Sequence, residues 1–275
     1  MGLQFPDKPD KLTPTEQRIL EYIEVNREEF LFMSIGQLSK RMGVCEASIS
    51  RFARHMGCQD FKQLKHMVME QNHLDGPAGK LIGTLLSGDA FHILQYLQKQ
   101  QQFLEKTIAH LDTAIFERAI TEICNARHIL IHAKSASASM GQLLFFRLRR
   151  LGLPVSLLFS GGSEMLEGLS QVKGGDLVIF FGFSKISWEG RVILKQAQES
   201  GYHTLCFTSR LHIPEEDQAN VNLYAYRGTE QEYHSMTAAA ALVDALIVGV
   251  SERLGADGAK HLHQLHQMKK AYWTP

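Results

Sequence analysis

The 275-residue sequence lacks the features that mark membrane and secreted proteins. Its longest apolar run, from Ala238 to Val250, is interrupted by Asp244. That run is shorter than the roughly 20 apolar residues that a membrane-spanning helix needs. The polar opening segment contains no apolar stretch typical of a signal peptide. We therefore expect a cytoplasmic protein with no membrane partner.

Cysteine is scarce and widely spaced. The four cysteines are Cys45, Cys58, Cys124 and Cys206. Because no two lie two to four residues apart, the sequence offers no zinc-type pair, and we expect reduced thiols. On a C-terminal helix only His263 and His266 would share a face, and His261 would not. We interpret these histidines as surface residues and expect no metal and no other cofactor.

Net charge is also absent, since 29 Lys and Arg residues balance 29 Asp and Glu residues. The charge is nevertheless unevenly distributed. Residues 34–68 contain six cationic and two anionic side chains, whereas residues 16–29 are mainly acidic. A local cationic patch of this size favours a small DNA-binding face over a wholly basic coat.

The chain divides into a helical part and an α/β part. A helix is predicted from Thr13, which can form a capping box with Glu16, and its buried stripe continues to Phe30. Further helices are predicted over residues 34–42, 46–56 and from 60, and the Gly76–Gly79 segment is interpreted as a linker. Residues 91–126 have helical periodicity with a break at Asp112. We predict domains at residues 1–77 and 127–275, joined by a helical linker at 78–126.

Short apolar runs alternate with helical stretches after Arg127. The five runs are 129–131, 155–158, 177–181, 204–207 and 221–224, and the main helical stretches are 139–151, 189–200, 235–254 and 258–272. Near-continuous apolar strands alternating with helices indicate a parallel sheet covered on both faces. The fold prediction is an all-α N-terminal domain followed by a three-layer αβα domain with a five-stranded parallel sheet.

Residues 35–52 have the pattern of a helix-turn-helix motif. Ile35, Leu38 and Met42 would pack the first helix, Gly43 permits the turn, and Val44 fills the corner. The second helix could then enter a major groove. The predicted DNA-binding residues are Glu46, Ala47, Ser48, Ser50, Arg51, Arg54 and His55, with Lys62 and Lys65 as backbone contacts from the next helix. A small helical bundle with solvated charges is the alternative interpretation.

This region resembles the RpiR family of bacterial transcription regulators. The resemblance rests on Gly43-Val44-Cys45-Glu46-Ala47-Ser48-Ile49-Ser50-Arg51-Phe52 and on the flanking segments 12–19 and 57–65. The family usually has Ser at the position of Cys45 and Thr at that of Ser48. A thiol is a weak hydrogen-bond acceptor, so we expect a less firmly held start to the recognition helix.

Small and hydroxyl-bearing residues follow two of the predicted strands. The first junction contains Lys134, Ser135 and Ser137, and the second contains Ser184, Lys185 and Ser187. Backbone N–H groups and hydroxyls at strand-to-helix junctions suit a phosphate, and ligands of parallel α/β sheets bind at the carboxyl ends of strands. These six residues are the predicted ligand-binding set. Ordinary capped turns are the alternative.

Residues 127–254 are similar to the sugar isomerase (SIS) domain, the usual C-terminal partner in RpiR regulators. Its first motif resembles G-x-G-x-S, which places Ala133 and Ser135 where the family has glycines. Its second motif resembles S-x-S-G-x-T, which places Gly182 at a serine position and Lys185 at a glycine position. A lysine held at positive φ is strained. The resemblance therefore implies a phosphosugar site with an altered second loop.

The resulting functional prediction is a transcription regulator controlled by a phosphorylated sugar and not an enzyme. Its expected partners are double-stranded operator DNA, a phosphosugar or related anion, and further copies of the chain in a homodimer or homotetramer. Glu230 and Glu232 lie where SIS isomerases can place a catalytic carboxylate, but no paired base stands at a defined spacing. The alternatives are a sugar-phosphate isomerase with an appended helical domain and a ligand-independent repressor with a vestigial pocket.

Overall fold

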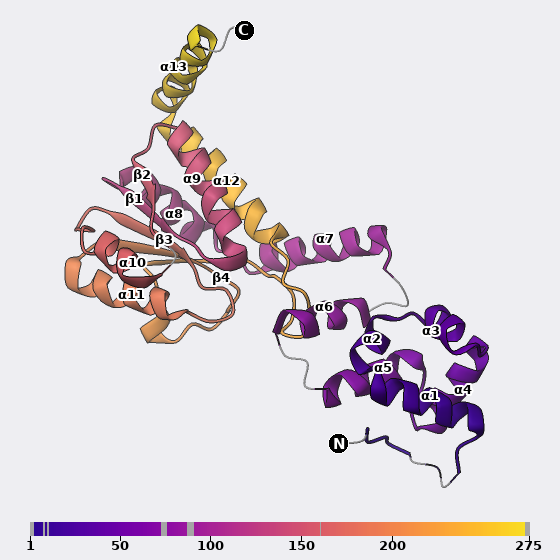
Figure 1. Cartoon of the computed structure of the whole chain (residues 1–275). Coiled ribbons are helices and arrows are strands. Elements are labelled where there is room, and N and C mark those ends of the chain that lie inside the picture. The colour runs from indigo at the N-terminus through magenta and orange to yellow at the C-terminus, as the bar shows by residue number, and fades with distance from the viewer. Residues whose placement is uncertain are drawn as a thin grey trace. The chain divides into compact units, whose positions relative to one another are not determined.

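The computed structural model describes residues 3–7, 9, 11–72, 76–86, 91–159 and 161–272. The chain forms two compact units, whose elements are labelled in Figure 1. The first comprises Met1–Lys99 with Gly228–Ser235, and the second comprises Gln100–Arg227 with Met236–Pro275. Across the described ranges, no helix combines the length and apolar character needed to cross a membrane.

The first unit is built from helices. They are α1 (Pro14–Val25), α2 (Arg27–Phe32), α3 (Ile35–Met42), α4 (Glu46–His55), α5 (Phe61–Gln71), α6 (Gly76–Leu86) and the beginning of α7 (Ile93–Ala109). The capping box predicted at the start of α1 is present, because the Thr13 hydroxyl accepts from the Glu16 amide and the Glu16 carboxylate accepts from the Thr13 amide. The apolar faces meet in one core, which includes Ile19, Ile23, Phe30, Leu38, Ile49, Phe52, Leu64, Val68 and Ile82.

Two sequence predictions for this unit are wrong in detail. The first helix does not continue to Phe30, because Asn26 leaves the helical conformation at φ −120° and ψ 43° and α2 begins at Arg27. The Gly76–Gly79 segment is not a linker but the first turn of α6. Pro77 is tolerated there because the first turn of a helix does not use its missing N–H. Ile82 then anchors α6 in the core.

The second unit contains the predicted parallel sheet. Its strands are β1 (Ile129–His132), β2 (Val155–Leu157), β3 (Leu177–Phe181), β4 (His203–Thr208) and β5 (Val221–Tyr224). They lie in the order β2-β1-β3-β4-β5, and every neighbouring pair is parallel. The chain therefore crosses from β2 over to β3 on the other side of β1. Ligands of such sheets bind outside the carboxyl ends of the strands at this reversal of strand order.

Helices cover both faces of the sheet, which confirms the three-layer prediction (Figure 1). Helices α8 (Thr113–Asn125), α9 (Ala138–Arg150) and α12 (Thr237–Leu254) share one core with inward residues such as Ile131, Ile179 and Leu205. Helices α10 (Gly162–Leu169) and α11 (Trp188–Ser200) cover the other face, over Val178 and Phe180. Helix α10 was not predicted from the sequence.

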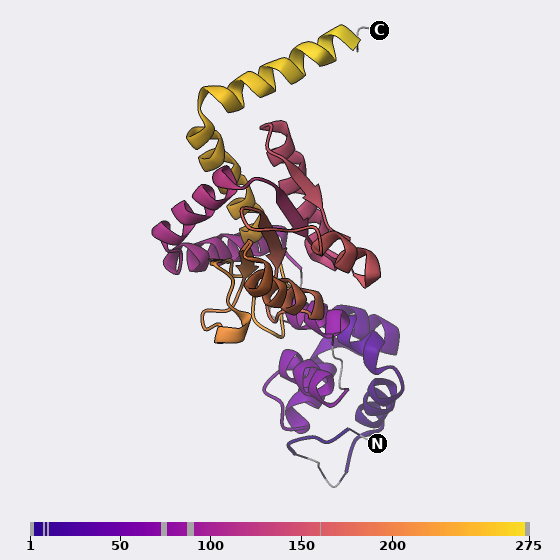
Figure 2. The same cartoon turned by 90° about the vertical axis from the view of Figure 1, so that its left-hand side faces the viewer.

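The predicted break between two helices at Asp112 is also present. Helix α7 ends at Ala109, and the Asp112 carboxylate accepts from the amides of Ala114 and Ile115 at the start of α8. At the other end of the chain, α13 (Ala256–Tyr272) continues from α12 and extends away from the sheet, as the yellow helix of Figure 2 shows.

Candidate nucleic-acid interface and anion site

Helices α3 and α4 form the predicted helix-turn-helix. Ser34 caps α3, and the helix ends at Gly43 in the left-handed conformation at φ 64°. The Ser39 hydroxyl donates to the Val44 carbonyl at 2.6 Å and secures the turn. Helix α4 then buries Ile49, Phe52 and Ala53. Its opposite face is left toward solvent.

Most of the predicted DNA-binding residues lie on this outward face. Glu46, Ala47, Arg51, Arg54 and His55 are exposed, and Ser48, Ser50 and Lys62 are half-buried. The Arg51 guanidinium donates to the Ser48 hydroxyl at 3.0 Å, which orients it along the leading turn of α4. His55 lies 2.9 Å from the Glu16 carboxylate and is therefore attached to α1. The arginines of α4 can thus reach a phosphate or a base edge.

Lys65 does not join this face. Its side chain is buried, and its ammonium donates to the Met33 carbonyl at 2.9 Å. Burial lowers the pKa of Lys65 to about 8. The ammonium also lies 5.8 Å from the ring centroid of Phe61 on the same helix, whereas its bond to Met33 connects α5 to the end of α2. In this conformation it cannot contact a DNA backbone.

The loop after β1 forms one half of the candidate anion site. Lys134 precedes a short 3-10 turn, Ser135–Ser137, which leads directly into α9. Among the described residues other than glycine, only Ser135 has a positive φ, at 52°. The loop therefore holds a conformation that normally requires glycine, at a cost of about 1 kcal/mol.

The loop after β3 forms the other half. Ser187 caps α11, because its hydroxyl accepts from the Gly190 amide at 3.3 Å. Ser184 and Lys185 are exposed between Gly182 and this cap. Both loops follow adjacent parallel strands, so all six predicted residues lie at the carboxyl edge of β1 and β3. Five of them are the four serines and Lys185, which are exposed or half-buried.

The sixth residue, Lys134, bridges the two loops. Its ammonium donates to the Glu189 carboxylate at 2.6 Å. Partial burial opposes ionisation of Glu189, but hydrogen bonds from Lys134 and Ser187 outweigh it and lower the pKa to about 2. A depressed pKa stabilises the folded state above the ordinary value of 4.5, and the gain is lost as the pH falls toward 2. Lys134 is thus a partner of Glu189 as well as a candidate anion contact.

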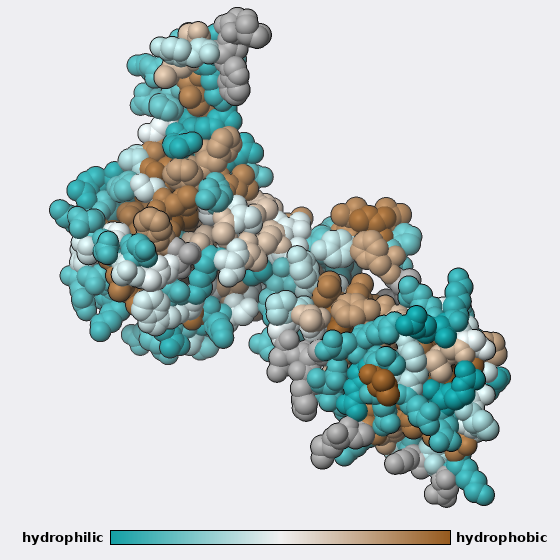
Figure 3. Space-filling model, viewed as in Figure 1, coloured by the Kyte–Doolittle hydropathy of each residue, from teal (hydrophilic) through white to brown (hydrophobic). Residues whose placement is uncertain are grey.

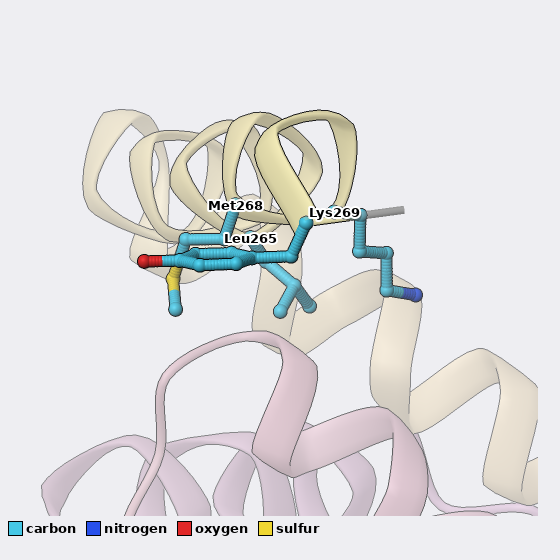
Figure 4. Close-up of a pocket in the computed structure, with 4 residues that line it drawn as sticks. Leu265, Met268 and Lys269 are labelled. Carbon is cyan, nitrogen blue, oxygen red and sulfur yellow. The ribbon is translucent and has the colours of Figure 1, made fainter. Parts of the chain in front are cut away.

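Two other kinds of site could compete with this one in the described residues: a metal centre and the surface hollow of Figure 4. In the portions of the chain that the structure describes, no group of three or more His, Cys, Asp or Glu side chains could hold a metal ion. The three C-terminal histidines are exposed on α13. Figure 4 shows an open hollow lined by Leu265, Met268, Lys269 and Tyr272. All four belong to α13, so the hollow is the flank of one helix.

Family comparisons match both units. Residues 3–73 match the helix-turn-helix domain of the rpiR family, and residues 122–249 match the SIS domain. The chain therefore combines a helix-turn-helix domain of the RpiR family with a SIS domain, as the sequence predicted.

Two solved structures are similar in fold to this chain. The sugar isomerase domain of an RpiR transcription factor from Sphaerobacter thermophilus is 22% identical with a TM-score of 0.59, covering 64% of this chain and 98% of that one. The Vibrio vulnificus NanR protein, solved as a complex with ManNAc-6P, is 18% identical with a TM-score of 0.60. That match covers 97% of this chain and 96% of NanR.

The structure explains how the first SIS motif accommodates Ala133 and Ser135 at its two glycine positions. Ala133 fits because Gly141 stands opposite on α9, where an added Cβ would lie 2.5 Å from the Ala133 Cβ. Ser135 keeps the glycine-like conformation described above. Residues 133 and 135 are thus accommodated without glycine, one by the space that Gly141 leaves and the other by a positive φ.

The second motif avoids the strain expected at Lys185, because Lys185 does not adopt positive φ. Gly182 stands where the family has serine, and an added Cβ there would overlap the Ile186 side chain. A serine at position 182 would therefore require Ile186 to move. Sequence reasoning did not find Ile186, because an apolar residue at a variable motif position carries no chemical signal.

Sequence reasoning also missed Arg227. Its buried guanidinium lies over the ring of Phe183, in the second anion loop, at 4.1 Å from the centroid. Arg227 is 43 positions from Ser184 in the sequence, and no spacing rule connects the two segments. Only the parallel arrangement of β3, β4 and β5 brings their ends to one edge.

The uncapped start of α4 gives a first prediction. Cys45 occupies the N-cap without a side-chain cap bond. Because a serine hydroxyl caps well, Cys45→Ser should raise the Tm of the first unit by about 2–4 °C in thermal unfolding followed by circular dichroism. Cys45→Ala should leave it nearly unchanged. Equal Tm values for the serine and alanine variants would show that the cap position is not limiting.

The conformation of Ser135 gives a second prediction. Ser135→Gly should raise the free energy of unfolding by up to about 1 kcal/mol, because relief of strain exceeds the added entropy of the unfolded chain. Ser139→Gly, on α9 four residues later, should lower it by about 0.5–1 kcal/mol. Denaturant titration measures both. A Ser135→Gly variant as destabilised as Ser139→Gly would contradict the strained geometry.

Proposed function

We propose that this RpiR-family chain is a DNA-binding transcription regulator whose SIS domain is controlled by a phosphorylated sugar. The observation that carries the DNA half is the two-sided character of α4. One face is fixed in the core through Ile49, Phe52 and Ala53, and the other presents Arg51 and Arg54. A rigid helix with an exposed cationic face suits insertion into a major groove.

Arg51 is the residue best placed to test DNA binding. It lies on the first half of α4 and is oriented by Ser48. If Arg51 makes a bidentate base contact, Arg51→Ala should weaken binding to an upstream promoter fragment by about 1–3 kcal/mol. Fluorescence anisotropy with a labelled fragment at fixed salt measures the change.

Arg118→Ala is the matched control, because it removes the same charge from an exposed position on α8 in the second unit. The Arg118→Ala variant should bind the promoter fragment with the same affinity as the wild type. Equal losses in both variants would show a general charge effect, and unchanged binding by Arg51→Ala would remove this residue from the interface. No binding of the wild type to any fragment at low salt would refute the DNA function.

The ligand half is supported by the loops at the carboxyl edge of β1 and β3. Strain at Ser135 is maintained although the family glycine is lost, and such strain is typical of functional sites. The exposed Ser184 and the amides that precede α11 can bind a phosphate. NanR, solved with ManNAc-6P, suggests the ligand class.

Ligand binding should be visible as thermal stabilisation. A sugar phosphate at 100 times its Kd should stabilise the second unit by about 2.7 kcal/mol, whereas the unphosphorylated sugar should not. Ser184→Ala should reduce the shift. Ser200→Ala, at the far end of α11, should not. No shift with any sugar phosphate would favour a ligand-independent repressor with a vestigial pocket.

A sugar-phosphate isomerase with an appended helical domain is the second candidate, supported by the SIS domain itself. We propose that the chain is not an enzyme, because the Glu232 carboxylate is committed to an ion pair with Lys99. A coupled assay on aldose and ketose phosphates distinguishes the two functions. Robust turnover would overturn the regulator proposal.

Self-association completes the proposal. A two-fold operator matches a symmetric protein, so we propose a homodimer or homotetramer. Phe91, just before α7, and Ile93, Leu94 and Leu97 at its beginning are exposed apolar side chains, which suit burial against another copy. Figure 3 shows a brown patch over this part of the chain. We propose that DNA binding is the function of residues 1–77 and sugar binding that of residues 127–275. Residues 78–126 connect them, although α6, most of which lies in this range, packs in the core of the first unit.

A further inference from the structure

The segment between β5 and α12 belongs by its contacts to the first unit. Residues 228–235 follow a strand of the sheet, yet they group with Met1–Lys99. The Tyr233 amide donates to the Thr84 hydroxyl at 2.6 Å, and the Lys80 ammonium lies 3.1 Å from Nε2 of His234. Gly83 leaves the space for this contact, because an added Cβ would overlap the Gln231 carbonyl. We call residues 228–235 the connecting segment.

An ion pair fixes the connecting segment further. The Glu232 carboxylate pairs with Lys99 of α7 and accepts hydrogen bonds from the amide and hydroxyl of Thr229. Burial opposes its ionisation, but the bonds from Lys99 and Thr229 prevail and lower the pKa of Glu232. The carboxylate therefore stays charged at neutral pH. It connects Thr229 and Glu232 within the segment and binds the segment to Lys99 of α7.

Helix α6 links these contacts to the DNA-binding core. Ile82, one residue before Gly83, is buried in the core that also contains Ile49 and Phe52 of α4. A displacement of the connecting segment would therefore act on a helix packed in the same core as the recognition helix. Packed cores transmit such displacements because they compress little.

The N-terminal end of the connecting segment follows directly after Arg227, which contacts the second anion loop. Arg227, the residue before Gly228, is buried with its guanidinium over the ring of Phe183. Phe183 is followed directly by Ser184, a candidate phosphate contact. Gly228 has φ 109°, a conformation that L side chains rarely adopt, and so provides a backbone position suited to rotation.

We infer that Arg227 and the connecting segment couple occupancy of the anion site to α6 and hence to the DNA-binding core. A phosphate bound beside Ser184 attracts the guanidinium of Arg227, because the two groups carry opposite charges and can form charge-assisted hydrogen bonds. Movement of Arg227 shifts residues 228–235 through the intervening glycine. The inference rests on the proposed function and names the path of its regulation.

Hydrogen exchange followed by mass spectrometry tests this path in the full chain. The probe is inorganic phosphate, compared with chloride at equal ionic strength. The variant is Glu232→Gln, which removes the ion pair with Lys99. Glu230→Gln is the matched control, because Glu230 is exposed on the same segment. A second probe, a short DNA duplex at low salt, approaches the path from its other end.

In the wild type and in Glu230→Gln, phosphate should protect residues 133–139 and 182–190. It should also change exchange in α6 and residues 228–235 by about fivefold or more. In Glu232→Gln the protection of the two loops should persist and the change in α6 should disappear. Protected loops with an unchanged α6 in the wild type would overturn the inference, as would a change in α6 that survives Glu232→Gln.

The DNA probe keeps the two proposals distinguishable. If phosphate protects neither loop, the proposed ligand site fails, and the DNA arm then decides the inference. By reciprocity of coupling, DNA that protects α4 should also change exchange in residues 228–235 and 182–190 of the wild type, and not in Glu232→Gln. Protection confined to the helices of the first unit would contradict the inference.

Discussion

The parallel direction of five strands is the constraint on which the rest of the account depends. Because every strand of the sheet points the same way, the segments that follow β1, β3 and β5 all begin at one edge. Two of them carry hydroxyls, amides and a lysine suited to an anion. The third carries Arg227, which lies against the second loop and continues into the connecting segment. Sheet direction thus places the proposed anion site and the proposed path of its regulation at the same edge of the sheet.

The two loops of the candidate anion site accommodate their substitutions differently. Ala133 fits because Gly141 opposite it has no Cβ, and Ser135 adopts a conformation that costs about 1 kcal/mol. In the second loop, Ile186 fills the space beside Gly182, and Glu189 forms an ion pair with Lys134. In the proposed function, a phosphate at this site meets a lysine that is already paired, so serine hydroxyls, backbone amides and the exposed Lys185 make the main contacts.

Local signals in the sequence predicted most of the fold. The Thr13 capping box, the Gly43 turn and the five apolar strands are governed by neighbouring residues, and the structure contains all of them. The errors arose where tertiary packing decides. Gly and Pro at residues 76–79 suggested a linker, but burial of Ile82 favours a helix there. Lys65 was predicted to be a surface cation, but its ammonium donates a hydrogen bond to the Met33 carbonyl and the side chain is buried. The contact of Arg227 with Phe183 depends on topology, which no local pattern encodes.

The central claim is that sugar-phosphate occupancy of one unit changes DNA binding by the other. Its most direct test is the Kd for a promoter fragment, measured by anisotropy at constant ionic strength with and without glucose 6-phosphate, fructose 6-phosphate or ManNAc-6P. The account predicts that at least one phosphorylated sugar changes the Kd by about 5–150-fold, in either direction, while its unphosphorylated counterpart has no effect. Tight DNA binding that is indifferent to every one of these ligands would contradict it.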